Sequence, residues 1–189
     1  LVAGDLTTTG GPLEPAGTMT YHELFEIYTE QITALAEAGA DLLVVETMLG
    51  IDEMTVALEA AQSVCALPVL CSMTVQADGS GYFGGTCVEA VETLQELGAA
   101  AVGINCSTGP DQLESLVRNM RQAAKVPLLV KPNAGMPEIS PEGEAIYSMG
   151  PAAFAQHMRT LIDAGAALVG GCCGTDPRYI SALRDVLPR

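Results

Sequence analysis

Basic residues are scarce in this chain, and none occurs in its first 117 residues. Only eight of the 189 residues are Lys or Arg, and the first of them is Arg118. Residues 1–117 carry 17 acidic side chains, whereas the remainder carries eight basic and six acidic ones. Phosphate binding needs a clustered basic face, so we expect no nucleic-acid partner. The acidic half is expected to form solvated helix faces rather than a docking surface for a basic partner.

Long apolar runs are missing as well. No apolar stretch approaches the ~20 residues of a membrane span, and the first residues lack the basic and apolar pattern of a signal peptide. We therefore expect no membrane association and a cytoplasmic location. In that compartment the six cysteines are expected to be thiols or metal ligands rather than disulfides.

The composition predicts one folded domain over residues 1–189. Hydrophobic residues make up 49% of the chain and the mean hydropathy is +0.31, which suffices for a sizeable core. Short apolar runs that indicate buried strands alternate with segments whose apolar residues recur at helical spacing. The expected strands cover residues 1–3, 42–45, 69–75, 101–104, 128–130 and 166–169.

Helix starts are marked between these strands. The pairs Thr20 with Glu23 and Thr86 with Glu89 have the capping-box pattern, Asp52 and Asp176 suit an N-cap, and Pro110 and Pro151 suit a first helical position. Each cap contributes about 1 kcal/mol. The connection over residues 132–150 is long for a loop, which is typical of functional or mobile segments.

A repeat underlies this alternation. Residues 37–44, 96–103 and 163–170 resemble one another, and residues 67–70 resemble residues 126–129. The repeating unit is two strand-helix pairs, which favours a parallel sheet covered by helices and a barrel over an open sheet. We count six strand-helix units, whereas a TIM (β/α)8 barrel holds eight. We expect the two missing units to belong on the N-terminal side.

Adjacent cysteines follow the last expected strand, in the stretch from Gly170 to Thr175. Successive strand residues point to opposite faces, so Cys172 and Cys173 can face one ligand only where the backbone leaves strand geometry, which the glycines permit. In tetrahedral zinc sites the sulfurs lie about 3.8 Å apart, close to the spacing of consecutive Cα atoms. The alternatives are two small buried side chains or a vicinal disulfide.

The C-terminal ends of the strands form the active face of such barrels. The residues delivered there are Glu46, Thr47, Met73, Thr74, Asn105, Cys106, Lys131, Pro132, Asn133, Cys172 and Cys173. The other cysteines, Cys65, Cys71 and Cys87, fall at a helix end, within a strand and in a helix cap, where packing is their expected role.

Three thiolates without a fourth protein ligand describe a catalytic zinc site with an open position. Such a metal can bind an incoming thiol and hold it as the thiolate at neutral pH. Three cysteine ligands leave the centre negative, which keeps the substrate sulfur electron-rich. The reaction that fits is attack of a thiolate on a carbon electrophile.

Two cysteine motifs resemble the zinc signature of the homocysteine S-methyltransferases. They are Gly103-Ile104-Asn105-Cys106 and the stretch from Gly170 to Thr175. The stretches Pro132 to Pro137 and Glu46-Thr47-Met48 are most similar to the homocysteine-binding domain of cobalamin-dependent methionine synthases. The resemblance covers essentially all 189 residues and implies the C-terminal three quarters of a homocysteine-binding barrel.

The resemblance also implies zinc-dependent methyl transfer to the thiolate of homocysteine, giving methionine. The implied residues are Cys106, Cys172 and Cys173 for zinc and Glu46, Asn105 and Thr47 for the substrate, with Glu46 near its amino group. Methylcobalamin, carried by another domain or protein, is the implied donor. The family's first-strand Asp-Gly-Ala-Met-Gly motif helps hold the amino-acid end of homocysteine and has no counterpart here, so we expect this chain alone to bind homocysteine poorly.

Three alternatives stay open. The first keeps the zinc chemistry and takes S-methylmethionine or betaine as donor. The second is a Schiff-base aldolase that uses Lys131 opposite Glu46, although a lysine paired with a nearby carboxylate is the favoured interpretation. The third is a binding or docking module with no turnover of its own. In each case we expect the open barrel edges to be met by another copy of the chain, by the missing segment or by aggregation.

Overall fold

The computed structural model describes residues 1–188. In chain order the elements are β1 (Ala3–Thr7), α1 (Tyr21–Glu37), β2 (Leu42–Met48), α2 (Ile51–Val64), β3 (Val69–Met73), α3 (Cys87–Glu96), β4 (Ala101–Cys106), the 3-10 helix η1 (Pro110–Gln112), α4 (Glu114–Ala123), β5 (Leu128–Pro132), β6 (Pro137–Ile139), β7 (Ala145–Tyr147), α5 (Pro151–Asp163), β8 (Ala166–Val169) and α6 (Pro177–Val186). The alternation of strand and helix confirms the predicted α/β class. Within the described part, no helix is both long and apolar enough to cross a membrane.

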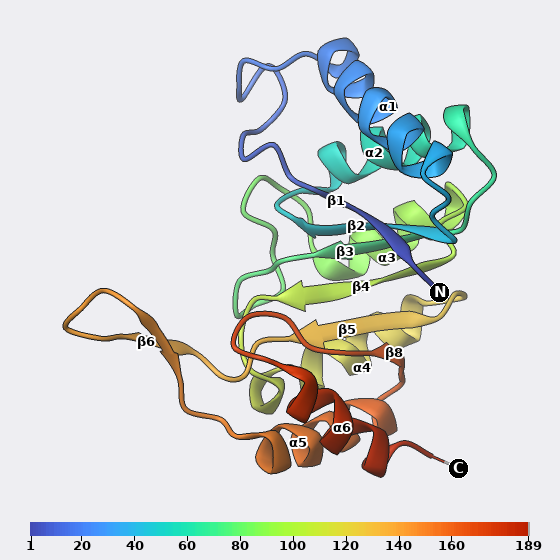
Figure 1. Cartoon of the computed structure of the whole chain (residues 1–189). Coiled ribbons are helices and arrows are strands. Elements are labelled where there is room, and N and C mark those ends of the chain that lie inside the picture. The colour runs from blue at the N-terminus through green and yellow to red at the C-terminus, as the bar shows by residue number, and fades with distance from the viewer. Residues whose placement is uncertain (189) are drawn as a thin grey trace.

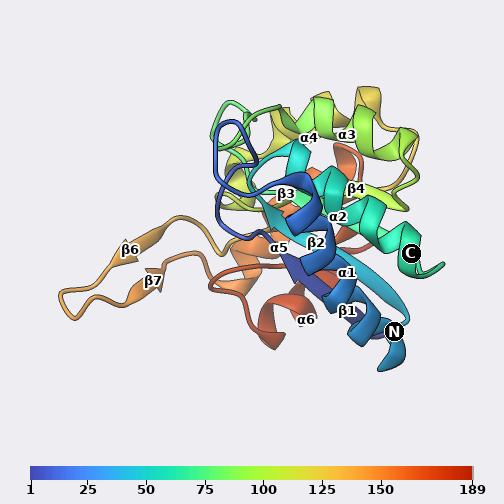
Figure 2. The same cartoon turned by 90° about the horizontal axis from the view of Figure 1, so that it is seen from above.

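Six strands form one parallel sheet in the order β1-β2-β3-β4-β5-β8 (Figure 1). Neighbouring strands lie about 4.8 Å apart, so alternate strands of a flat sheet lie about 9.6 Å apart. Here Cα atoms of β2 and β4, and of β3 and β5, approach within 8 Å, so the sheet is strongly curved. Each helix contacts the next from α1 to α6, and together they cover the outer side of the sheet (Figures 1 and 2). This is the arrangement of a partial TIM barrel with six strand-helix units, as the repeat predicted.

The core lies between the outer face of the sheet and the helices. Side chains alternate between the two faces of a strand, and Leu43, Val45, Cys71, Val102 and Val130 point outward and are fully buried. Together with the apolar stripes of the helices they form one hydrophobic cluster. Burying one Val or Leu side chain contributes about 1.5–3 kcal/mol, so this layer fixes the strands on which the site is built.

The inner face of the sheet is partly open. Val44 lies beside Leu70, and Leu129 lies beside Leu168 on the edge strand β8. The Leu168 side chain is 37% exposed. Across residues 1–188, no strand pairs with the outer edge of β1 or of β8, so both edges present unpaired backbone groups.

Two of the predicted helix caps form as expected, and one is wrong. Thr20 and Glu23 make a complete capping box, in which each backbone N–H donates to the other side chain, at 2.9 and 3.2 Å. The carboxylate of Asp176 caps α6. Asp52 is not the cap of α2, because that helix already begins after Gly50, whose extended backbone packs against Phe83. Asp52 lies instead in the first turn, where its charge complements the helix dipole.

Two other helix starts differ in detail from the prediction. The Thr86 hydroxyl accepts the N–H of Glu89 at 3.2 Å, but the Glu89 carboxylate accepts the Thr86 hydroxyl and not its N–H. That capping box is therefore half formed. Pro110 begins a separate 3-10 helix, η1, and Leu113 links it to α4, so the single helix expected there is divided.

A buried carboxylate fixes the loop that follows β1. Glu53 is 5% exposed and accepts four hydrogen bonds. The donors are the Thr8 hydroxyl at 2.6 Å, the N–H and the hydroxyl of Thr9 at 2.7 Å each, and the Tyr28 hydroxyl at 3.0 Å. A buried charge needs such partners, and these tie the β1 loop to α1 and α2.

The long connection after β5 forms an antiparallel hairpin. β6 pairs with β7 in the register Pro137 with Tyr147 and Ile139 with Ala145. The hairpin projects away from the sheet and its helices in both views (Figures 1 and 2). The segment that the sequence marked as an unusual loop therefore has a defined structure.

Candidate metal and substrate site

Three cysteines from two distant parts of the chain meet where β4 ends and just beyond the end of β8. The sulfur of Cys173 lies 3.8 Å from that of Cys106 and 4.0 Å from that of Cys172, and all three lie within 4.8 Å of one another. Tetrahedral zinc with Zn–S bonds of about 2.3 Å separates its sulfurs by about 3.8 Å, so the donor set fits this ion. In the part of the chain that the structure describes, no fourth His, Cys, Asp or Glu joins the group.

The backbone leaves strand geometry before the vicinal pair, as the glycines suggested. β8 ends at Val169, and the cysteines follow in an irregular loop. The Thr175 hydroxyl donates to the carbonyl oxygen of Cys172 at 2.7 Å. A Cβ at Gly171 would lie 2.5–2.8 Å from side-chain atoms of Thr175, so only glycine fits beneath it. Gly174 has φ 77°, the left-handed region that glycine adopts at no steric cost.

Left-handed backbone also occurs at three non-glycine residues of this face. They are Thr47 (φ 58°), Cys106 (φ 57°) and Ser107 (φ 60°). Such conformations cost about 1–3 kcal/mol each and cluster at functional sites. The turn at Cys106 lets two consecutive residues serve the site, because Asn105 contacts Cys172 while Cys106 contacts Cys173.

Asn105 connects the cysteines to the neighbouring strands. Its side-chain oxygen accepts the N–H of Thr47 and the hydroxyl of Ser72, each at 2.8 Å. Its amide nitrogen donates to the Thr47 hydroxyl at 2.8 Å and to the Cys172 sulfur at 3.8 Å. With four hydrogen bonds to three residues and 1% exposure, the Asn105 side chain has one orientation. The structure thus brings Asn105 and Thr47 to the cysteines, and it adds Ser72, which the sequence analysis missed.

Ser107 is a second residue that the sequence analysis missed. Its hydroxyl accepts the N–H of Val75 at 2.9 Å and donates to the carbonyl oxygen of Asn105 at 3.1 Å. Its own N–H donates to the Thr74 hydroxyl at 3.2 Å. These bonds hold the turn after Cys106. The position directly after a proposed metal ligand was the signal that could have found it.

In the cysteine cluster, the pKa values of Cys106 and Cys172 are shifted in opposite directions. The Cys106 thiol donates toward Cys172, and this bond, with further donors from Cys173 and Asn105, lowers the pKa of Cys172 to about 5. The same bond, together with burial, raises the pKa of Cys106. Burial and the neighbouring sulfur of Cys173 raise the pKa of Tyr147. The cluster already favours one thiolate at neutral pH.

Glu46 and Lys131 form an ion pair across the inner face of the sheet. Their side chains are 21% and 23% exposed, and the bond joins Lys131 Nζ to Glu46 Oε2. Lys131 lies against Gly170, at the start of the cysteine loop. Burial and the Glu46 carboxylate raise the pKa of Asp5 on the edge strand, and Lys131 partly offsets this. The paired lysine is therefore the interpretation that the structure confirms for Lys131.

The remaining cysteines lie away from this site. Cys71 on β3 and Cys87 at the start of α3 are buried in the hydrophobic cluster, and Cys65 is partly buried against it. Burial raises the pKa of Cys71 to about 12 and also raises that of Cys87. Their expected packing role is confirmed.

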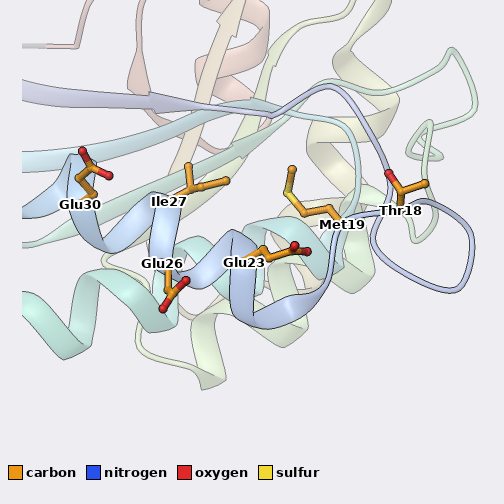
Figure 3. Close-up of a pocket in the computed structure, with 6 residues that line it drawn as sticks. All are labelled: Thr18, Met19, Glu23, Glu26, Ile27 and Glu30. Carbon is orange, nitrogen blue, oxygen red and sulfur yellow. The ribbon is translucent and has the colours of Figure 1, made fainter.

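A wide surface hollow lies elsewhere than at the cysteines. It has a volume of about 540 Å³ and follows the outer surface of α1 (Figure 3). The lining residues are Thr18, Met19, Glu23, Glu26, Ile27 and Glu30. Helices cover the outer side of the sheet, whereas the converging polar groups lie at the strand ends. We therefore place the candidate site at the cysteine cluster and not in this hollow.

The fold and the site define an α/β protein with a partial TIM barrel and three thiols that converge at its strand ends. Residues 1–187 match the family described as homocysteine S-methyltransferase. The chain belongs to this family.

Similar proteins include two methionine synthases and one homocysteine methyltransferase. The chain is 30% identical over 186 residues to methionine synthase of Mycobacterium leprae and 31% identical over 177 residues to that of Mycobacterium tuberculosis. These matches cover 95% and 90% of the chain but span only 15% of each synthase. The apo structure of the homocysteine methyltransferase MmuM from Escherichia coli aligns with a TM-score of 0.80 at 25% identity, covering 99% of this chain and 63% of that one.

Proposed function

We propose that the chain binds one zinc ion through Cys106, Cys172 and Cys173 and takes part in methyl transfer to the sulfur of homocysteine, giving methionine. The observation that carries the proposal is the convergence of these sulfurs within 4.8 Å in a member of the homocysteine S-methyltransferase family. A metallated form of the similar E. coli MmuM, with a TM-score of 0.67 at 25% identity, supports a metal in this fold. No other group of metal-binding side chains was found among residues 1–188.

The surrounding residues have distinct roles in this proposal. Zinc bound at the three thiolates supplies the positive charge that lowers the pKa of an incoming thiol. Asn105 orients Cys172 through the amide–sulfur contact, as outer partners orient metal ligands. Thr47 is held beside it by two hydrogen bonds. Glu46 binds the ammonium group of homocysteine through a charge-assisted hydrogen bond and exchanges part of its pairing with Lys131.

The proposed methyl donor is methylcobalamin, carried by another domain or protein. The similarity to two methionine synthases supports it, and most of the length of those proteins lies outside the matched part. S-methylmethionine and betaine are the alternative donors with the same zinc chemistry. The Schiff-base alternative has less support, because Lys131 is ion-paired with Glu46.

We also propose that the 189 residues are the C-terminal three quarters of a homocysteine-binding barrel. Six parallel strands against the eight of a complete barrel support this, as does the alignment with 63% of the E. coli chain. In a complete barrel the inner face around Val44 and Leu168 would be closed by further strands. A cytoplasmic location remains a prediction, and the six free cysteines accord with it.

Metal analysis and a donor assay test the proposal together. The purified chain, and a chain extended upstream by two strand-helix units, are assayed for zinc and for methionine formation from homocysteine. Methylcobalamin, S-methylmethionine and betaine are supplied in parallel, and we expect methionine with methylcobalamin, chiefly from the extended chain. A chain without zinc, or methionine formation that is unchanged by chelation, would refute the proposal. Trapping of a carbonyl substrate on Lys131 by borohydride would favour the aldolase instead.

A further inference from the structure

The loop that carries Cys172 and Cys173 is held on one side by the end of β5. The N–H of Cys172 donates to the carbonyl oxygen of Pro132 at 2.8 Å, and the N–H of Ala134 donates to that of Cys173 at 2.9 Å. The N–H of Cys173 donates to Asn133 Oδ1 at 3.1 Å. These bonds fix the backbone of both cysteines against the first residues of the long connection.

Tyr147, the last residue of β7, lies against the other side of the same loop. A Cβ at Gly174 would lie 2.5 Å from Cδ2 and 2.7 Å from Cδ1 of Tyr147, so the ring rests directly on the glycine backbone. The φ of 77° at Gly174 also disfavours any residue with a Cβ. Ala145 and Ile146 are exposed, whereas Tyr147 is partly buried and packs against the hydrophobic cluster. Tyr147 is therefore the residue of β7 that touches the body of the protein.

The chain after Tyr147 is anchored beside the same loop. The N–H of Met149 donates to the carbonyl oxygen of Ala134 at 3.3 Å, and the carbonyl oxygen of Met149 accepts the Tyr179 hydroxyl at 2.7 Å. Both ends of the projecting hairpin are thus fastened where the cysteine loop is fastened. The loop lies between them, with Ala134 on one side and Tyr147 on the other.

We infer that Tyr147 is a positioning residue for the metal-binding cysteines, an inference that rests on the proposed zinc site. The backbone bonds to the end of β5 hold the loop on one side, and on the other side the ring of Tyr147 packs against it at Gly174. The Tyr147 ring on Gly174 prevents the loop from moving away from Cys106. The contact with Gly174 is made by ring carbons, so the positioning comes from the ring; the hydroxyl lies near the Cys173 sulfur and is the group that Tyr147→Phe removes.

Metal affinity and the spectrum of the cobalt-substituted chain test this role. Zinc affinity is measured by competition with a chromophoric chelator, and the thiolate-to-cobalt absorption bands report the geometry of the three sulfurs. Tyr147→Ala should weaken zinc binding about 10- to 100-fold, the usual effect of losing an outer partner of a metal ligand, and should alter the cobalt bands. Tyr147→Phe keeps the ring and should match the wild type in both measurements.

Ile146→Ala is the matched control, because this neighbour is 53% exposed on the opposite face of the hairpin. It should leave the zinc affinity and the cobalt bands unchanged. Wild-type affinity and bands in Tyr147→Ala would overturn the inference, and so would a Tyr147→Phe variant as impaired as Tyr147→Ala. A wild-type chain that binds neither zinc nor cobalt would instead refute the proposed zinc site.

A second variant approaches the same contact from the loop. Gly174→Ala places a methyl group against the Tyr147 ring and should reproduce the altered cobalt bands. In the Tyr147→Ala background the same substitution should have a smaller effect, because the ring is gone. Equal effects in both backgrounds would mean that the backbone conformation of Gly174, and not Tyr147, positions the cysteines.

Discussion

The outer face of the sheet and its strand ends place the same residue type in opposite chemical states. Cys71, fully buried among apolar side chains on the outer face, has its pKa raised to about 12. Cys172, beyond the end of β8, has its pKa lowered to about 5 by neighbouring hydrogen-bond donors. Burial without a polar partner favours the thiol, whereas donors aimed at the sulfur favour the thiolate. Position relative to the strand end, and not residue type, separates packing from chemistry.

Two glutamates, one in the helix layer and one at a strand end, also differ in their partners. Glu53, on α2, is buried and accepts four hydrogen bonds from Thr8, Thr9 and Tyr28. Glu46, at a strand end on the inner face, is partly exposed and pairs with Lys131. The first carboxylate has all its hydrogen-bond partners within the fold, whereas the second keeps access to solvent.

Serine substitution of single cysteines should give the largest contrast between the two regions. Cys106→Ser, Cys172→Ser or Cys173→Ser removes one of three zinc ligands, so the zinc content should fall from one per chain to near zero. Metal analysis of the purified variants measures this. Full zinc retention after Cys106→Ser would remove this residue from the site.

Cys71→Ser is the control for these variants. It should retain one zinc per chain, because the Cys71 sulfur belongs to the hydrophobic cluster. It should also lower the free energy of unfolding by about 1–3 kcal/mol, because a hydroxyl is buried without a partner. Loss of zinc together with unchanged stability would contradict the division between the two regions.

In the metal-free chain, Cys172 should be alkylated much faster than Cys71. With a pKa of about 5, Cys172 is mostly thiolate at pH 7, whereas Cys71, with a pKa of about 12, is thiolate in about one molecule in 10⁵. Iodoacetamide should label Cys172 at a rate that is constant above about pH 6 and falls as the pH drops through 5. Mass spectrometry of digested samples gives the rates, and a Cys172 rate that keeps rising to pH 9 would contradict the lowered pKa.

Glu46→Gln should have a smaller effect, confined to the substrate. A hydrogen bond between charged groups contributes about 1.5–3 kcal/mol, so the homocysteine Kd should rise about 10- to 100-fold while the zinc content stays unchanged. Calorimetry on a chain extended upstream by two strand-helix units measures the Kd.

Glu53→Gln is the matched control for that measurement. It should lower the thermal stability, because it disturbs a carboxylate that accepts four hydrogen bonds. The homocysteine Kd of the folded protein should stay closer to the wild-type value than that of Glu46→Gln. An unaltered Kd in Glu46→Gln would remove Glu46 from the substrate site.

Much of the fold and the three proposed ligands could be predicted because they follow from local patterns and one geometric rule. Apolar runs alternating with amphipathic segments indicated the strands and helices, and the repeat indicated their parallel arrangement. The strand-end rule then brought Cys106, Cys172 and Cys173 together despite their separation in sequence. The division of the six cysteines followed from the same rule.

The residues that the sequence did not reveal depend on register and on the path of loops. Ser72 reaches Asn105 because β3 pairs with β4 in one particular register, and no motif marks it. Tyr147 reaches Gly174 because a hairpin returns to its starting point, which composition does not specify. Asp52 was misassigned as a cap because its side-chain type was right, while packing at Gly50 set the start of α2.

The smallest expected effect concerns the open side of the barrel, where the inner face meets an unpaired edge. An exposed parallel edge with apolar neighbours invites pairing, so we expect the wild-type chain to self-associate reversibly. Leu168, 37% exposed on β8, lies on this face, and Leu168→Lys should weaken association by less than about tenfold, since only part of one leucine's ~1.5–3 kcal/mol burial energy is at stake.

Sedimentation velocity over a range of concentrations measures the midpoint of association. Ile139→Lys adds the same charge at a 70% exposed position on β6, in the hairpin that projects away from the sheet (Figure 1), and should leave the midpoint unchanged. Zinc content should match the wild type in both variants, because neither residue is one of the three proposed ligands. If the wild-type chain is monomeric at all concentrations and binds homocysteine as tightly as the extended chain, the six strands already form a complete functional unit, and the open edge has no role in association.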